Sequence, residues 1–172
     1  MTGPADLRVT LTDWFGKFSR AIGTAMNMKA YYANAAQIYS FFLANGFTPA
    51  QACGILAQAD AESSLDPTAV GDKDTAFGMF QWHGARATVI KKGCGVDVAK
   101  LPPMTDQLTA ALWELNHSEH SASIQIKLAT TAYDAGYAAA RFWERPGSPL
   151  QYAKRGDKAE AWATYFSQHP VA

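Results

Sequence analysis

The sequence has no surplus of either charge and no long apolar run, and both absences exclude classes of protein. Lysine plus arginine and aspartate plus glutamate number 15 each. A protein that binds phosphate backbones or anionic lipid by long-range attraction carries a positive balance, so nucleic acid is not expected as a partner. No stretch approaches the roughly 18 consecutive apolar residues of a membrane span, so stable membrane association is not expected.

Cysteines are scarce and carry no recognisable motif. Cys53 and Cys94 lack the C-x-x-C spacing of metal or redox sites, and two free thiols are preferred over a disulfide between them. His117 and His120 lie three residues apart without further ligands, so no metal is expected. No glycine-rich phosphate loop and no nucleophile motif with a base partner is visible, and no cofactor is expected.

The length and the hydrophobic content fit one folded domain. The 172 residues are enough for one hydrophobic core and too few for two ordinary domains. With 48% hydrophobic residues and 12% aromatic residues, the chain is not of the disordered class.

Apolar residues recur at three- and four-residue steps along most of the chain, which predicts an all-α, or mainly α, fold. The expected helices cover about 13–26, 31–43, 49–63, 85–92, 105–115, 121–130, a segment ending near Trp143, and 149–167. Thr48, Pro49 and Gln51 have the order of an N-cap, a first helical residue and a capping-box partner. Residues 1–29 are expected to form an amphipathic helical segment packed on a domain at 30–168, with a membrane-disturbing helix as the alternative.

The pattern changes between Leu65 and Gln81, where turn formers replace apolar periodicity. We expect a loop there, with a short hairpin over 76–82. Trp113, Trp143 and Trp162 fall on helical stripes and are expected in the core. The pairs Lys91-Lys92 and Lys154-Arg155 are interpreted as solvated helix faces.

Glu62 is the candidate chemical group. It follows Ile55 by seven residues and Ala59 by three, which places it on the core-facing stripe in the last turn of its helix. Partial burial and the negative end of the helix dipole are both expected to raise the pKa of a carboxyl there. Cleavage of a glycosidic bond needs an acid that keeps its proton near neutral pH. The alternative is a helix-end carboxylate turned to water.

The residues that follow Glu62 carry a resemblance. Glu62-Ser63, then Gly78-Met79-Phe80-Gln81-Trp82, then Arg86 resemble the motifs of phage tail lysozymes within the lysozyme-like superfamily. Segments around Trp113 and Trp143 look like later helices of that family, and the similarity covers about 35–166. The resemblance implies a lysozyme-like helical domain with a long cleft loop or short hairpin after the catalytic helix.

The resemblance also suggests roles for individual residues. Glu62 would be the catalytic acid, and Asp72 or Asp74 would be a second carboxylate that positions water, with Thr75 helping to orient it. Substrate contacts are expected from Ser63, Gln81, Trp82 and Arg86. Turn or surface positions for the two aspartates, core packing for Trp82 and a carboxylate pair or surface role for Arg86 are the alternatives. Glu144 is considered as a buried ion-pair carboxylate that supports the cleft.

The expected activity is hydrolysis of the β-1,4 bond between N-acetylmuramic acid and N-acetylglucosamine in peptidoglycan, used in bacterial cell-wall lysis. A lytic transglycosylase that gives 1,6-anhydro products, a chitinase-like enzyme and an inactive saccharide-binding module remain alternatives. We expect a monomer, made in the cytoplasm without a recognisable signal peptide. Release at lysis, delivery by a phage tail or secretion would bring it to the wall.

Overall fold

The computed structural model describes the backbone of residues 11–171 and side chains from Met26 onward. The helices in this range are α1 (Leu11–Ala44), α2 (Pro49–Ser63), α3 (Gly84–Cys94), α4 (Met104–Asn116), α5 (His120–Leu128), α6 (Ala132–Ala138) and α7 (Leu150–Gln168). A 3-10 turn at Val98–Lys100 and a π-helical turn at Ala139–Glu144 complete the helical part. The strands are β1 (Val70–Gly71), β2 (Ala76–Phe77) and β3 (Trp82–His83). The predicted mainly α class is confirmed.

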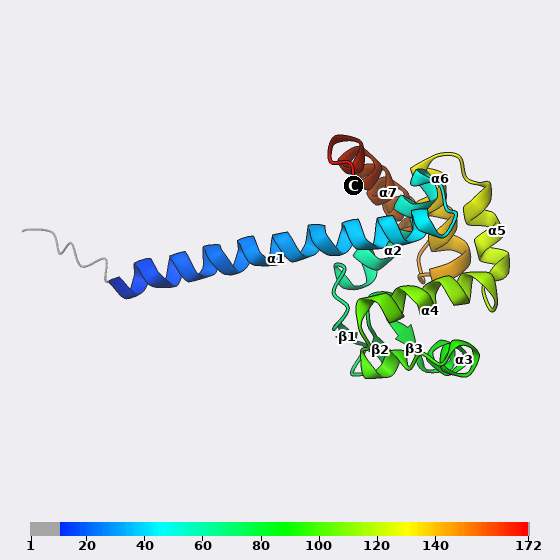
Figure 1. The fold of residues 1–172 in the computed structure, drawn as a ribbon, viewed down its shortest axis with the longest axis horizontal. Helices are drawn as coiled ribbons and strands as arrows, with labels where there is room; N and C mark the ends of the chain where they lie inside the picture. Colours follow the sequence, from blue (N-terminus) through cyan, green and yellow to red (C-terminus); the bar gives the residue numbers. More distant parts are fainter. Residues whose placement is uncertain (1–10, 172) are drawn as a thin grey trace, which may run out of the picture.

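The first helix is longer than predicted. Instead of two helices meeting near residue 30, α1 runs unbroken from Leu11 to Ala44, and Figure 1 shows its N-terminal half extending away from the other helices. The segment between the two predicted helices contains no proline or glycine that would end a helix. Residues Met26–Ala30 are exposed. The side chains of residues 1–25, on which the rest of that prediction falls, lie outside the described residues.

Helix α2 is the central element, and residues 51–60 of it are buried. It begins as predicted: Thr48 Oγ1 accepts a hydrogen bond from the backbone N–H of Gln51 at 3.3 Å, and Gln51 Oε1 accepts one from the backbone N–H of Thr48 at 3.0 Å. This capping box satisfies two backbone donors that a helix start leaves free. The helix ends at Ser63, and Ser64 and Leu65 then take left-handed conformations, with φ of 54° and 63°.

Two glycines let α2, α6 and α7 approach closely. A Cβ on Gly54 of α2 would lie 2.6 Å from the backbone carbonyl carbon of Ala135 in α6. A Cβ on Gly136 of α6 would lie 2.5 Å from the backbone oxygen of Arg155 in α7. Real Cβ atoms do not approach this closely, so only glycine fits at either position. The three backbones are therefore held in contact beside the last turns of α2.

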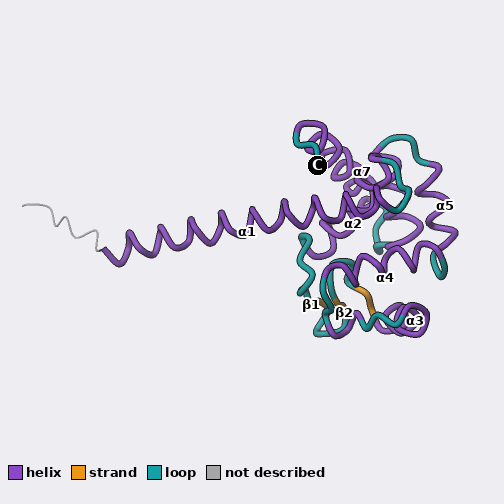
Figure 2. Tube along the Cα trace, viewed as in Figure 1, coloured by secondary structure: helices purple, strands orange, loops and turns teal. Residues whose placement is uncertain are grey.

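A small antiparallel sheet follows α2 (Figure 2). Its strand order is β1-β2-β3, with Val70 opposite Phe77 and Gly71 opposite Ala76 in the first pair, and Ala76 opposite His83 and Phe77 opposite Trp82 in the second. The hairpin predicted over 76–82 is observed as β2 and β3, and β1 extends it by one strand. The sheet is thus the next element after α2, whose last turn carries Glu62.

The hydrophobic core connects the small sheet to the helices. Trp82 in β3 and Trp143 before α7 are both fully buried and pack against Phe80, with ring centroids 5.2 and 5.0 Å from that of Phe80. Trp143 and Trp162 lie in the core as predicted, whereas Trp113 is only partly buried. None of the helices within residues 11–171 combines the length and apolar character needed to cross a bilayer.

Candidate active site

The carboxyl group of Glu62 lies at the end of α2 and is partly accessible to solvent. Its side chain is 23% exposed, and Glu62 Oε1 accepts a hydrogen bond of 2.5 Å from Nη2 of Arg155 in α7. The expectation of a half-buried carboxyl in the last helical turn is met. The sequence interpretation did not foresee the cation beside it.

The guanidinium of Arg155 is held by two side chains of α2, those of Gln58 and Glu62. Its side chain is 7% exposed, and Nη1 donates a 2.9 Å hydrogen bond to Oε1 of Gln58, one turn before Glu62. The amide nitrogen of Gln58 donates in turn to the backbone oxygens of Gly54 and Gly136, both at 3.0 Å. The guanidinium is therefore positioned by the same close helix contact that the two glycines permit.

The interpretation of Lys154-Arg155 as a solvated helix face is wrong for Arg155, which is buried, and holds for Lys154, which is exposed. A signal for this existed in the sequence. Arg155, Ala159, Trp162 and Phe166 follow the four- and three-residue steps of one helical stripe, and all four are buried. A charged residue on such a stripe is buried only when a partner compensates it, and Glu62 is that partner.

A second cluster of charges is centred on Arg86 of α3. Its Nε and Nη2 donate to the two carboxylate oxygens of Glu114 in α4, at 2.7 and 2.8 Å, in a bidentate pair. Its Nη1 donates to Oε2 of Glu144 at 2.8 Å. Arg86 is thus paired with carboxylates, which was the alternative to the expected substrate contact, and Glu144 forms the ion pair considered for it.

Two tryptophans complete the surroundings of Glu114. Trp82 Nε1 and Trp143 Nε1 donate to Glu114 Oε2 at 3.1 and 2.9 Å, and the Glu114 side chain is only 1% exposed. The expectation that Trp82 offers a flat face to a sugar is wrong, because its ring is fully buried and contacts the core. Its polar edge anchors a carboxylate instead.

The pKa values of the two glutamates in this cluster shift in opposite directions. Burial raises the pKa of Glu114, but the hydrogen bonds and charge of Arg86 and the two indole N–H donors outweigh it, and the net shift is downward. Burial raises the pKa of Glu144, the negative charges of Glu62 and Glu114 add to the rise, and Arg86 only partly opposes it. The cluster therefore favours the charged form of Glu114 and opposes that of Glu144.

Other predicted site residues hold the hairpin in place. Ser63 Oγ donates to the backbone oxygens of Ala59 and Met79, both at 3.0 Å, which ties the end of α2 to the sheet. Gln81 Nε2 donates to the backbone oxygen of Gly78 at 2.8 Å. The hydroxyl of Ser63 and the amide donor of Gln81 are thus engaged within the protein and not turned toward a substrate.

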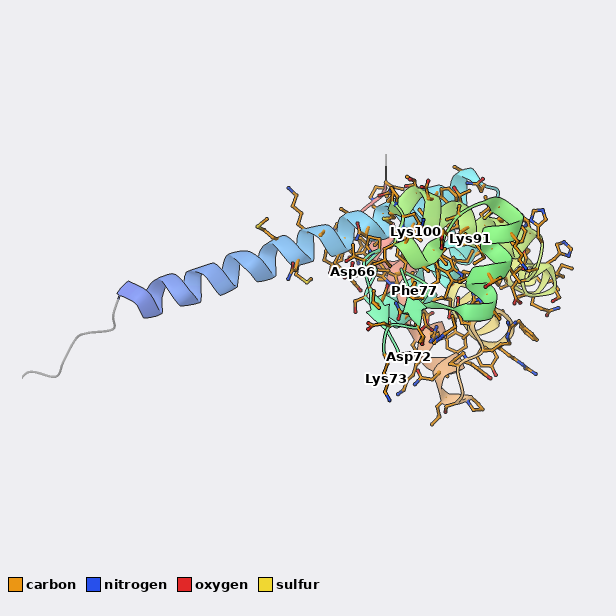
Figure 3. The ribbon with its side chains drawn as sticks, turned by 90° about the horizontal axis from the view of Figure 1, so that it is seen from below. Asp66, Asp72, Lys73, Phe77, Lys91 and Lys100 are labelled. Atoms are coloured by element: carbon orange, nitrogen blue, oxygen red, sulfur yellow. The ribbon has the colours of Figure 1, made fainter. Side chains whose placement is uncertain are left out.

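Asp72, Asp74 and Thr75 are exposed and lie in the turn between β1 and β2. Figure 3 shows Asp72 and its neighbour Lys73 at the edge of the molecule. Asp72 Oδ2 contacts Nε2 of His83 at 3.1 Å, and the Asp72 side chain is 72% exposed. Thr75 Oγ1 donates to the backbone oxygen of Asp72 at 2.7 Å. The contacts of Asp72 are therefore made within the sheet and not with Glu62.

Cys53 is buried, Cys94 is partly buried, and both are free thiols, as the preferred interpretation had it. Among the described residues, no three histidine, cysteine, aspartate or glutamate side chains are grouped so that they could hold a metal ion.

A helical domain in which a small antiparallel sheet follows a helix ending in a partly exposed glutamate is a lysozyme-like domain. The family model described as phage tail lysozyme matches residues 33–166, and the chain belongs to this family. The predicted resemblance over about 35–166 is thereby confirmed.

The chain is also similar to Morphogenesis protein 1 of Bacillus phage B103. The two are 28% identical over 149 residues, an alignment that covers 80% of this chain and 40% of the relative. The chain therefore corresponds to less than half of the length of this relative.

Proposed function

We propose that the protein is a muramidase that hydrolyses the β-1,4 bond between N-acetylmuramic acid and N-acetylglucosamine, with Glu62 as the general acid. The observation that carries the proposal is the partly exposed Glu62 carboxyl at the end of α2, held by the buried guanidinium of Arg155. The family match adds the substrate class, because phage tail lysozymes are cell-wall hydrolases. Fold alone would not support an activity, and the site residues do.

The acid step needs one proton on Glu62 and a defined direction for its delivery. The hydrogen bond from Arg155 to Oε1 fixes the carboxyl and leaves Oε2 as the oxygen to donate a proton to the leaving group.

The second step uses a water molecule that attacks the sugar from the opposite face. In the proposed inverting reaction, Asp72 or Asp74 activates this water and Thr75 orients it, which requires a gap between the two carboxyl groups. One observation favours a second candidate: both aspartates are exposed, and Asp72 contacts His83. If neither reaches the substrate, the 6-hydroxyl group of the sugar attacks instead, and the enzyme is a lytic transglycosylase that forms 1,6-anhydro ends.

A turbidity assay on purified peptidoglycan tests the proposal. Glu62→Gln keeps the shape of the side chain and removes the proton donor, so lysis should fall by about a hundredfold or more, with an unchanged circular dichroism spectrum. Glu160→Gln, an exposed carboxyl on α7, is the matched control and should lyse like the wild type. Full activity of Glu62→Gln would overturn the role of Glu62.

Product masses then separate the reaction types. Reducing ends indicate hydrolysis, and anhydro ends indicate transglycosylation. Asp72→Asn and Asp74→Asn, assayed in parallel, identify the second carboxylate by the larger loss of turnover. An inactive saccharide-binding module would bind sacculi without releasing fragments, whether or not Glu62 is present. We expect the protein to act as a monomer that reaches the wall after release, tail delivery or secretion.

A further inference from the structure

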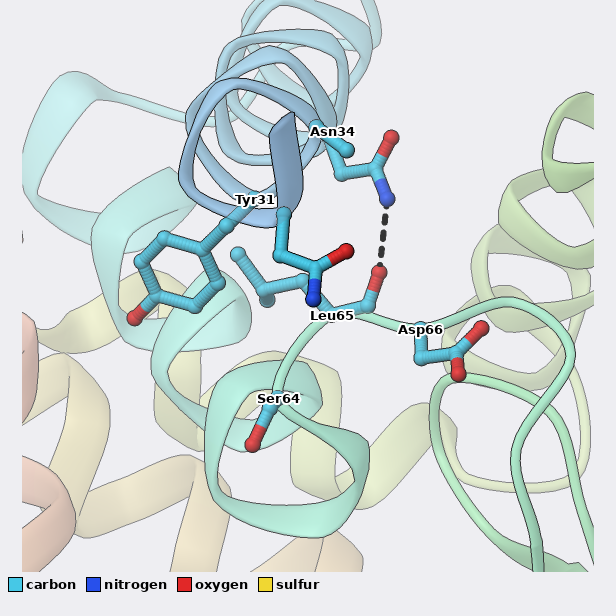
Figure 4. A pocket seen from close by; sticks show the side chains of 7 residues that line it. Tyr31, Asn34, Ser64, Leu65 and Asp66 are labelled. Carbon is cyan, nitrogen blue, oxygen red and sulfur yellow. Dashed lines mark hydrogen bonds between the residues drawn. The ribbon is translucent and has the colours of Figure 1, made fainter. Parts of the chain in front are cut away.

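A pocket of about 360 Å³ lies between α1 and the turn that follows Glu62. Asn27, Tyr31 and Asn34 line it from α1, and Ser64 and Asp66 line it from the turn (Figure 4). The three α1 residues are spaced by four and three positions and so lie on one face of the helix. Ser64 is two residues after Glu62, so the pocket begins next to the end of the helix that carries the proposed acid.

The wall formed by the turn is rigidly held. Ser64 and Leu65 both have left-handed conformations, with φ of 54° and 63°, and such a conformation in a buried leucine persists only when its surroundings enforce it. Asn34 Nδ2 donates a 2.9 Å hydrogen bond to the backbone oxygen of Leu65, which Figure 4 shows as the link between α1 and the turn. The pocket is therefore preformed.

The lining combines polar side chains with apolar ones and carries no cation. Asn34 uses its amide nitrogen for Leu65, which leaves its side-chain oxygen to accept, while the carboxamide of Asn27 and the hydroxyl of Ser64 supply donors. Asp66 Oδ1 accepts from the backbone N–H and the hydroxyl of Thr68 at 2.8 and 2.7 Å, so its negative charge is fixed at the rim. Tyr31 adds a ring. None of the described residues that line the pocket is a lysine, arginine or histidine.

From this lining we infer that the pocket is a subsite for a neutral N-acetylhexosamine, the N-acetylglucosamine unit of the glycan, and that it rejects sugars with a free carboxylate. Carboxamide and hydroxyl groups match the acetamido and hydroxyl groups of such a sugar. The Asp66 carboxylate repels anions, and no cation compensates it. Asn27 and Tyr31 precede residue 33, where the family match begins, so this subsite includes residues outside the matched region. The inference rests on the proposed function.

Sugar binding is tested in the Glu62→Gln background, which binds without turnover. The probes are tri-N-acetylchitotriose, cellotriose as a neutral trisaccharide without acetamido groups, and a muramic acid oligomer with free lactyl carboxylates. Asn27→Ala should weaken the affinity for tri-N-acetylchitotriose about fivefold, the loss expected for one hydrogen bond. It should leave the affinity for cellotriose unchanged. Lys29→Ala, an exposed position on the same helix, is the control and should bind like the parent.

Asp66→Asn tests the charge selection. The amide keeps an oxygen for Thr68 and removes the negative charge, so binding of the muramic acid oligomer should tighten several-fold while that of tri-N-acetylchitotriose changes little. Chemical shifts of the Asn27 and Asn34 side-chain amides should move on addition of tri-N-acetylchitotriose.

Equal affinities of Asn27→Ala and Lys29→Ala, or unmoved Asn27 and Asn34 signals, would overturn the subsite. The lytic activity of the wild type is measured separately. A wild type that lyses walls with no effect of Asn27→Ala on sugar binding refutes the subsite alone. A wild type that releases no fragments refutes the proposed function, whatever the pocket binds.

Discussion

Arg155 donates a 2.5 Å hydrogen bond to the carboxylate of Glu62 across 93 residues of sequence. The pair joins α7 to the end of α2, and Gln58 extends it to the backbone of α6. The position of the proposed acid is therefore set by three helices together and not by α2 alone.

Arg155→Lys should lower kcat by about tenfold to a hundredfold, with a smaller change in KM. Lysine keeps the positive charge but has no planar fork, so it does not bond Gln58 and Glu62 together, and a small misplacement of a catalytic group carries a loss of this size. Steady-state kinetics on soluble glycan fragments measure the effect. Lys154→Ala, the exposed neighbour, is the control. An unchanged kcat in Arg155→Lys would show that the pair does not position the acid.

Glu114→Gln should lower the free energy of unfolding by about 3–5 kcal/mol, because it leaves the partly buried Arg86 without its bidentate partner and places an amide donor among the indole N–H groups. Urea denaturation measures the change. Glu119→Gln removes a more exposed ion pair with Arg145 and should lower stability by only about 0.2–1 kcal/mol. Similar losses in the two variants would contradict the structural role of Glu114.

The raised pKa of Glu144 predicts a specific pH dependence of stability. A raised pKa means that the folded state binds the proton more tightly than the unfolded state, in which the pKa of the carboxyl is about 4.3. The stabilisation of the wild type relative to Glu144→Gln should be fully present below that pH. It should fall as the pH rises through the folded pKa, by up to about 1.4 kcal/mol per pH unit.

Urea denaturation of the wild type and Glu144→Gln between pH 4 and 8 checks this dependence, with Glu160→Gln as an exposed control. A difference in free energy of unfolding that stays constant, or that grows with pH, would show that Glu144 does not hold its proton more tightly in the folded protein.

The two thiols should differ in reactivity. Burial raises the pKa of Cys53 to about 12, and burial also blocks access to it, whereas Cys94 is partly exposed at the end of α3. Ellman's reagent should titrate Cys94 in the native protein and both thiols after unfolding. Cys94→Ser should abolish the native reaction. Fast native labelling in Cys94→Ser, or no thiol in the unfolded wild type, would contradict the assignment.

Local signals in the sequence predicted local structure well. Thr48 and Gln51 specify the start of α2 through neighbouring atoms, and the stripe that includes Glu62 predicted its partial burial. The continuity of α1 was missed because two well-marked apolar stripes were interpreted as two helices, although nothing between them breaks a helix.

The candidate site depends on contacts that local patterns do not contain. The role of Trp82 was misjudged because an aromatic ring beside a family motif fits a sugar platform and a core position equally well, and only the packing around Phe80 decides. The burial of Arg155 depends on Glu62 and Gln58, which are distant in sequence. The turn that carries Asp72 and Asp74 was recognised from its residues. Its position relative to Glu62 is set by the pairing of the strands, which a local pattern does not contain.

The close contact of α2, α6 and α7 has a consequence for how this protein tolerates change. At Gly54 and at Gly136, a hydrogen atom on the α-carbon points into a space that is too small for a methyl group. An alanine at either position touches no substrate, yet it would push apart the supports of the guanidinium and move the proton donor with them. In a library of random variants selected for lysis, these two positions should therefore be as intolerant as the acid itself.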